Sequence, residues 1–190
     1  MTRAELEHII RASGEIAQVK TVFIFGSQAI LATAPSITNS NSNTADALSL
    51  QSYTILLRSM EADIMIPGSQ EKTDLVEAAI GELSQFHNTY GYYVQGVDLT
   101  TSTLPEGWRN RLVNICNENT NGISGLCLEI HDLIIAKLYA GRRKDVNFFK
   151  AAVNLGLLSK RILLKRLLKT NISEKRRLII KNIINRGFGK

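Results

Sequence analysis

A short apolar run that stops at Gly26-Ser27 does most to limit how this chain folds. Residues 21–25, Thr-Val-Phe-Ile-Phe, are mostly β-branched or aromatic, which favours a buried strand. The Gly-Ser pair that follows is typical of a tight turn, and residues 28–31 continue with apolar character as the start of a helix. The segment therefore predicts a strand, a turn and a helix in close succession.

Further apolar segments predict a chain that mixes strands and helices. Apolar periodicity predicts helices over residues 4–18, 71–86 and 132–140, and strands over 54–66, 90–97 and 108–115, with a short apolar segment at 126–128. Residues 33–52 are rich in Ser, Thr, Asn and Ala, so we expect an exposed loop, at least in the first half. Everything after residue 145 is helical in pattern, with Ser159 and Ser173 as helix N-caps.

These elements indicate one α/β (α+β) core with a mixed sheet and an appended helical unit. We place the core at residues 1–128 and a basic helical subdomain at residues 129–190. A length of 190 residues suits one domain, or one domain with a small appended unit.

Charge is divided unevenly along the chain. Residues 1–136 hold 7 Lys/Arg and 15 Asp/Glu, a net charge of −8, whereas residues 137–190 hold 16 Lys/Arg and 2 Asp/Glu, a net charge of +14. An excess of this size near one end favours contact with a polyanion such as a nucleic acid or a nucleotide. The alternative is that the last helices are simply solvated.

Several classes of protein are disfavoured by composition. Two cysteines cannot make a disulfide framework, and three scattered histidines make no obvious zinc site. No apolar run approaches the ~20 residues that span a bilayer, and the start of the chain has no secretory pattern. We therefore expect a cytoplasmic protein without a membrane partner.

Two short motifs carry the candidate chemistry. Gly26 and Ser27, between a strand and a helix, could bind phosphate, although such a pair is often only a turn. Glu61 and Asp63 lie two residues apart in an expected strand, so their side chains project from the same face. Paired carboxylates suit Mg²⁺ or Mn²⁺, although two surface acids would give the same pattern.

Together these segments resemble the DNA polymerase β-like nucleotidyltransferase superfamily, in which a strand ending in Gly-Ser precedes a strand with an acid-x-acid pair. Residues 23–31, 58–64 and 92–97 are similar to an uncharacterised bacterial branch of nucleotidyltransferases. Residues 131–138 and 141–145 fit that branch and are similar to the Lys-then-Asp helical motif of abortive-infection nucleotidyltransferase toxins. The resemblance covers roughly residues 20–155.

The resemblance implies roles for individual residues. Gly26 and Ser27 would hold the phosphates of a nucleoside triphosphate (NTP), the donor substrate, and Glu61 with Asp63 would bind the divalent metal. Two departures stand out: Glu61 replaces the commoner Asp, and Glu61 lies 34 positions after Ser27. Pairing Asp63 with Met65 instead would break the metal site, which favours the Glu61 and Asp63 pairing.

The resemblance also suggests later residues. Asp98, at the end of the 90–97 strand, is the positional candidate for a third carboxylate, although a loop acid is an equal alternative. Lys137 would offset phosphate charge, or would simply belong to a basic helix end. We expect Asp145 to cap the next helix and to pair with a basic neighbour.

The expected function is metal-dependent transfer of a nucleoside monophosphate from an NTP to a hydroxyl of RNA, a protein or a small molecule. The alternative is a catalytically decayed member of the same fold that binds nucleic acid. A further alternative is a module whose basic tail contacts an acidic protein partner such as an antitoxin. The sequence leaves the oligomeric state open.

Overall fold

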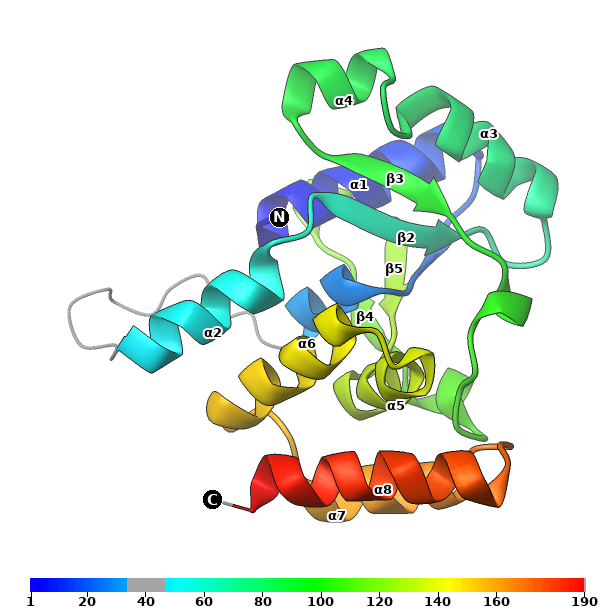
Figure 1. Cartoon of the computed structure of the whole chain (residues 1–190). Coiled ribbons are helices and arrows are strands. Elements are labelled where there is room, and N and C mark those ends of the chain that lie inside the picture. The colour runs from blue at the N-terminus through cyan, green and yellow to red at the C-terminus, as the bar shows by residue number, and fades with distance from the viewer. Residues whose placement is uncertain (34–46, 190) are drawn as a thin grey trace.

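The computed structural model describes residues 1–33 and 47–189, and within them a mixed five-stranded sheet forms the centre of the molecule (Figure 1). The strands lie in the order β3-β2-β1-β5-β4. Their bounds are β1 (Thr21–Ile24), β2 (Glu61–Met65), β3 (Tyr93–Gly96), β4 (Val113–Ile115) and β5 (Ser124–Cys127). Antiparallel pairs join β1 to β2 and β4 to β5, and parallel pairs join β1 to β5 and β2 to β3. The expected mixed-sheet α/β (α+β) class is confirmed.

One face of the sheet is covered by α1 (Arg3–Ile16) and α3 (Gln70–Ile80). A β-carbon on Gly125 of β5 would lie 2.3 Å from the Cδ1 atom of Ile10, so Gly125 and its neighbour in register, Val22, face α1. Alternation along the strands then places Ile24 and its partner Ile64 on this buried face. The side chains at positions 61 and 63 must therefore project from the opposite face.

Several boundaries differ from the sequence predictions. Residues 47–57 form helix α2 (Ala47–Leu57) and not a loop running into a strand; the expected loop residues 34–46 lie outside the described part. The apolar residues of α2 pack along α6 (Arg143–Asn154), and this tertiary contact outweighs their β propensity. The helix expected behind Gly26 is only the short 3₁₀-helix η1 (Ser27–Ala32).

Two further predicted elements are shorter than expected. The predicted helix 71–86 ends at residue 80, and a second helix, α4 (Gln85–Tyr90), begins after Leu83 with its positive φ of 62°. The predicted strand 108–115 is divided into the 3₁₀-helix η4 (Trp108–Arg111) and β4. Two other 3₁₀ turns are η3 (Leu99–Thr101) and η5 (Glu118–Thr120).

The last part of the chain is helical, as predicted. After α5 (Ile130–Ala140) and α6, the helices α7 (Lys160–Leu168) and α8 (Glu174–Phe188) lie side by side beneath them (Figure 1). The Oγ atoms of Ser159 and Ser173 accept hydrogen bonds from the first turns of α7 and α8, which confirms both N-caps. The division of the chain into two domains at residue 128 stays a prediction.

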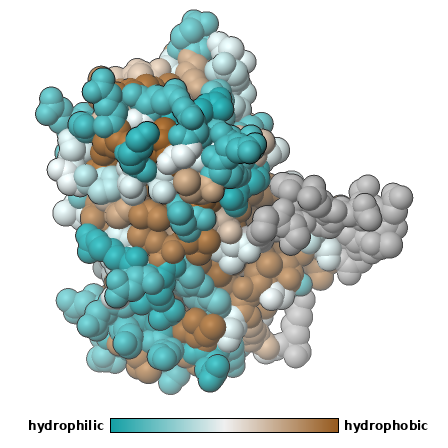
Figure 2. Space-filling view, turned by 180° about the vertical axis from the view of Figure 1, so that it is seen from behind, coloured by the Kyte–Doolittle hydropathy of each residue, from teal (hydrophilic) through white to brown (hydrophobic). Residues whose placement is uncertain are grey.

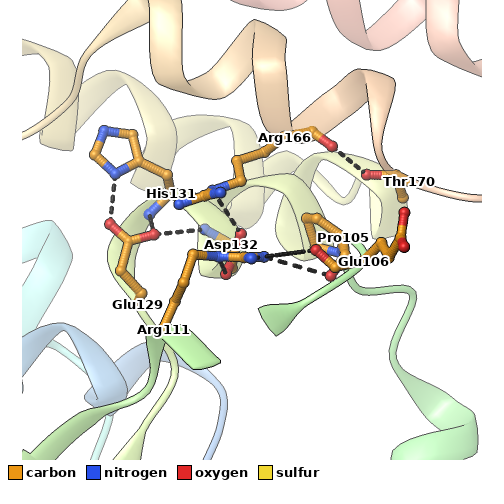
Figure 3. Close-up of polar contacts among 8 residues, drawn as sticks. All are labelled: Pro105, Glu106, Arg111, Glu129, His131, Asp132, Arg166 and Thr170. Carbon is orange, nitrogen blue, oxygen red and sulfur yellow. Dashed lines mark hydrogen bonds and ion pairs between the residues drawn. The ribbon is translucent and has the colours of Figure 1, made fainter. Parts of the chain in front are cut away.

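A buried ion network holds the N-terminal end of α5. Arg111 and Arg166 approach the fully buried carboxylate of Asp132 from two sides, at 2.7 and 3.2 Å (Figure 3). Arg111 also donates to the carbonyls of Pro105 and Glu106, at 3.4 and 3.1 Å. The network therefore joins α5 to the loop before η4 and to α7.

The neighbouring residue His131 forms a second link between α5 and α7. The Nδ1 atom of His131 lies 2.6 Å from the Glu129 carboxylate, and its Nε2 atom accepts a hydrogen bond from the backbone N–H of Ser159 at 3.0 Å. Because Nε2 accepts, the neutral ring carries its proton on Nδ1. His131 is therefore a structural link to the start of α7.

The C-terminal end of α5 is held by α8. The guanidinium of Arg176 donates to the carbonyls of Leu138 and Tyr139 and lies over the Tyr139 ring. Carbonyls in the last turn of a helix have no partner within the helix, so a cation there satisfies them. Arg166 and Arg176 together fix both ends of α5 to the last two helices.

No helix within residues 1–33 and 47–189 combines the length and apolar character needed to cross a bilayer.

The Asp132 network predicts a large stability effect. Asp132→Asn keeps the shape of the side chain but leaves two half-buried arginines without their counter-charge, so it should lower the free energy of unfolding by about 3 kcal/mol. Glu174→Gln is the control, because the exposed Glu174–Arg177 pair should contribute less than about 1 kcal/mol. Urea unfolding of both variants measures the difference. Equal losses would contradict a structural role for Asp132.

Candidate active site

A cavity of about 880 Å³ opens on the face of the sheet opposite α1. Its floor is the end of β1 with the acid-bearing part of β2 and the end of β3. Its walls are the end of α2, the chain at 97–103, the inner side of α5 and the start of α6. The candidate residues Gly26, Ser27, Glu61, Asp63, Asp98 and Lys137 all line it.

The turn at Gly26 is built around the Asp63 carboxylate. Gly26 has φ +59°, a conformation that favours glycine, and a β-carbon there would lie 1.8 Å from the Oδ2 atom of Asp63. The backbone N–H of Phe25 donates to the Asp63 carbonyl at 2.8 Å. Asp63 itself, and not a ligand, occupies the space that the missing β-carbon leaves.

Glu61 and Asp63 form a close acid pair, as their spacing predicted. The two carboxyl groups are near enough to share a hydrogen bond. Burial, the hydrogen bond to Glu61 and the charge of Glu61 raise the pKa of Asp63 to about 7, while Lys137 and Lys144 act in the opposite direction. Near neutral pH the pair therefore holds a proton that a cation could displace.

Lys137 reaches the Gly-Ser turn from α5. Its Nζ atom donates to Ser27 Oγ at 2.9 Å, lies 3.6 Å from the Asp145 carboxylate and sits 4.6 Å from the centre of the Phe148 ring. The side chain is buried, which lowers the pKa of Lys137, whereas Asp145 and Asp63 raise it. Lys137 is therefore a buried cation and not a solvated one, and its role toward phosphate stays a prediction.

Asp145 pairs with basic neighbours, as expected, but it does not cap α6. It lies in the first turn of that helix, whose N-cap is Arg142, and accepts from Arg142 Nε at 2.7 Å. Its fully buried carboxylate therefore joins Lys137 and Arg142. The hydrogen bond to Asp145 raises the pKa of Arg142.

Asp98 lies apart from the acid pair. It lines the same cavity, and its carboxylate accepts from the backbone N–H of Thr100 at 2.7 Å, which caps η3. Within the described residues no three His, Cys, Asp or Glu side chains come together as a metal-binding group. The assignment of Asp98 as a third carboxylate stays a prediction.

The acid pair nevertheless suits a hard divalent cation. Mg²⁺ is often bound through one or two carboxylates together with substrate phosphates, and it keeps several waters. Glu61 and Asp63 supply two adjacent oxygen-donor groups on the wall of a cavity large enough for a nucleotide. Burial and the neighbouring Glu61 raise the pKa of Asp63 more than Lys137 and Lys144 lower it, so a cation bound at the pair would favour the ionised form of Asp63.

Sequence reasoning missed other residues that line the cavity or contact the acid pair. Arg58 follows α2 and reaches the cavity, which required knowledge of where α2 ends. Tyr93 and Gln95 lie opposite Glu61 and Asp63 in the register of β3, and the Tyr93 hydroxyl donates to Glu61 Oε2 at 3.3 Å. The alternation of residues 92–97 could have placed these two side chains on one face, but not next to the acids.

The comparison with family models identifies the class of protein that this fold and site define. Residues 4–183 match the family described as "Nucleotidyltransferase of unknown function (DUF6036)". The match spans nearly the whole chain, so the chain belongs to this nucleotidyltransferase family. No curated protein and no solved structure matches it.

The Gly26 turn predicts a strong effect of a single methyl group. Gly26→Ala should lower the free energy of unfolding by about 3 kcal/mol, because backbone strain adds to overlap with Asp63. Gly156→Ala is a matched control: its φ is +68°, but nothing lies within 4 Å of the added carbon, so about 1 kcal/mol is expected. Denaturant titration compares them, and equal losses would contradict the Asp63 contact.

The raised pKa of Asp63 predicts how stability depends on pH. The folded state holds a proton that the unfolded state releases near 3.8, so the metal-free protein should lose stability as pH rises from about 4 to about 7. Asp63→Asn should remove this loss. The melting temperatures of both proteins are measured in a chelator over this pH range. Their difference cancels the pH dependence that comes from Glu7 and Glu129, whose pKa values are lowered, and leaves that of Asp63. A difference that is constant with pH would contradict the prediction.

Proposed function

We propose that this protein is a metal-dependent nucleotidyltransferase of the DNA polymerase β-like superfamily, in the branch related to abortive-infection toxins. The observation that carries the proposal is one cavity in which an acid pair, a Gly-Ser turn and a buried lysine meet. The reaction joins an acceptor hydroxyl to the α-phosphorus of an NTP and breaks the bond to the β-phosphate. Pyrophosphate leaves, and the hydroxyl proton passes to solvent.

The donor phosphates would lie between the Gly-Ser turn and α5. Ser27 Oγ and Lys137 Nζ already contact each other, so a phosphate oxygen could accept from both groups. The carboxylate of Asp145 lies 3.6 Å from Lys137 Nζ and favours the charged form of this buried lysine. Arg58, Arg142 and Lys144 line the same cavity and add positive charge beside the triphosphate.

The acid pair would hold the metal beside the reacting phosphorus. Mg²⁺ or Mn²⁺ bound there would offset charge on the phosphates and favour loss of the hydroxyl proton. Glu61 and Asp63 must release their shared proton for this. The pKa of Asp63 is raised to about 7, so a bound cation, or a pH above neutral, would promote the release. Asp98 lines the same cavity, apart from the acid pair, and is the proposed third carboxylate.

The basic helices favour an acceptor of high negative charge, and RNA is the proposed one. Arg166, Arg176 and Arg177 are used within the protein, as partners of Asp132 or of helix-end carbonyls. Other cations of α7, of its C-cap and of α8 are exposed, and within the described residues no ion pair engages them: Lys160, Arg161, Lys165, Lys169, Lys175, Lys181 and Arg186. Seen from behind, the lower left part of the molecule is mostly hydrophilic (Figure 2).

Substitution of the acids tests the proposal. Glu61→Gln and Asp63→Asn should reduce transfer from an α-labelled NTP to background, because neutral amides bind Mg²⁺ poorly. Ser27→Ala should raise KM for the NTP about tenfold, because it removes one hydrogen bond to a charged group. The assay offers each labelled NTP, Mg²⁺ or Mn²⁺, and total RNA, protein or small molecules as acceptors. If the basic helices bind RNA, the RNA should become labelled at low salt, and this labelling should be lost at high salt.

Matched controls separate the outcomes. Asp74→Asn changes an exposed acid on α3, away from the cavity, and should leave transfer intact. Full activity in Glu61→Gln and Asp63→Asn would contradict the metal site. Absence of transfer by the wild-type protein with every NTP and acceptor would favour the decayed, binding-only alternative, and capture of an acidic protein instead of RNA would favour the partner module.

A further inference from the structure

The strand beside the acid pair brings a tyrosine against one of the acids. Because β2 and β3 are parallel, Glu61 lies opposite Tyr93 and Asp63 lies opposite Gln95. Side chains at paired positions project from the same face, so all four point toward the cavity side of the sheet. The Tyr93 hydroxyl donates to Glu61 Oε2 at 3.3 Å.

The ring of Tyr93 is held in turn by the start of α4. The His87 ring lies 4.5 Å from it, centre to centre, at an angle of 46°. His87 Nδ1 accepts a hydrogen bond from the backbone N–H of Leu83 at 3.0 Å. The backbone N–H of His87 donates to Ser84 Oγ, which caps α4, at 3.1 Å. The Tyr93 ring therefore packs against a histidine whose position is fixed by hydrogen bonds to the turn between α3 and α4.

Glu61 has few other restraints. It is the first residue of β2, and within the described residues no lysine or arginine forms an ion pair with it. Its carboxyl group meets Tyr93 on one side and Asp63 on the other. A glutamate side chain has three rotatable bonds, so without the phenol it could turn away from Asp63 into the cavity.

We propose that Tyr93 is a positioning residue for the acid pair, which holds Glu61 in the orientation that places its carboxylate beside that of Asp63. This proposal rests on the proposed function, since it assigns Tyr93 to the metal-binding pair. A hydroxyl suits this role, because it donates a hydrogen bond without adding a third negative charge. A phenol hydroxyl carries a proton at neutral pH, so Tyr93 can donate to Glu61 Oε2.

Direct metal binding by Tyr93→Phe tests the proposal without an activity assay. Mn²⁺ titration followed by electron paramagnetic resonance should show affinity weakened at least about tenfold, as for other groups that orient metal ligands. The melting temperature in a chelator should stay near that of the wild type, because the ring and its contact with His87 remain. In the transfer assay the Mn²⁺ concentration needed for half-maximal rate should rise, while kcat at saturating Mn²⁺ should change little.

Tyr90→Phe is the matched control. Tyr90 belongs to a different ring cluster, with His8, Phe86 and Tyr92, so loss of its hydroxyl should leave Mn²⁺ affinity unchanged. Equal Mn²⁺ affinity in Tyr93→Phe and wild type would overturn the role of Tyr93 alone. A large fall in melting temperature in Tyr93→Phe would overturn it in favour of a merely structural role. Absence of Mn²⁺ binding by the wild type would overturn both this proposal and the metal site.

Discussion

Gly26 and the carboxylate of Asp63 fill the same small space between β1 and β2, and the rest of the site depends on that contact. The antiparallel pairing brings the end of β1 against the middle of β2, and only a residue without a β-carbon lets Asp63 turn back over the strand end. Ser27 follows directly and meets Lys137 from α5. The proposed phosphate-binding turn and the proposed metal-binding acid are therefore positioned by one contact.

Local chemistry was readable from the sequence where it depends on a few neighbouring residues. The β-branched run before Gly26, the shared face of Glu61 and Asp63, and the N-caps at Ser159 and Ser173 all follow from spacing and propensity. Residues 54–57 could not be assigned in this way, because their apolar, β-branched composition suits a strand and only packing against α6 makes them helical. Tyr93 was missed for a similar reason, since strand register is not visible in one segment.

Net charge also conceals how individual cations are used. The excess of +14 in residues 137–190 correctly marks a basic region, but it includes Lys137 and Arg142, which share the buried carboxylate of Asp145. It also includes Arg177, which donates to the carbonyls of Leu167 and Ile172. Counting charges therefore overstates the surface that remains for a partner, and only burial and hydrogen bonding separate the two groups.

The fixation of α5 at both ends changes how the last two helices can be studied. Arg166 holds the start of α5 through Asp132, and Arg176 holds its end through Leu138 and Tyr139, with Lys137 between these points. Deleting α7 and α8 would remove both supports at once. A shortened chain would lose the alignment of Lys137 together with any surface for a polyanion, so dissecting this region requires substitutions of single exposed lysines.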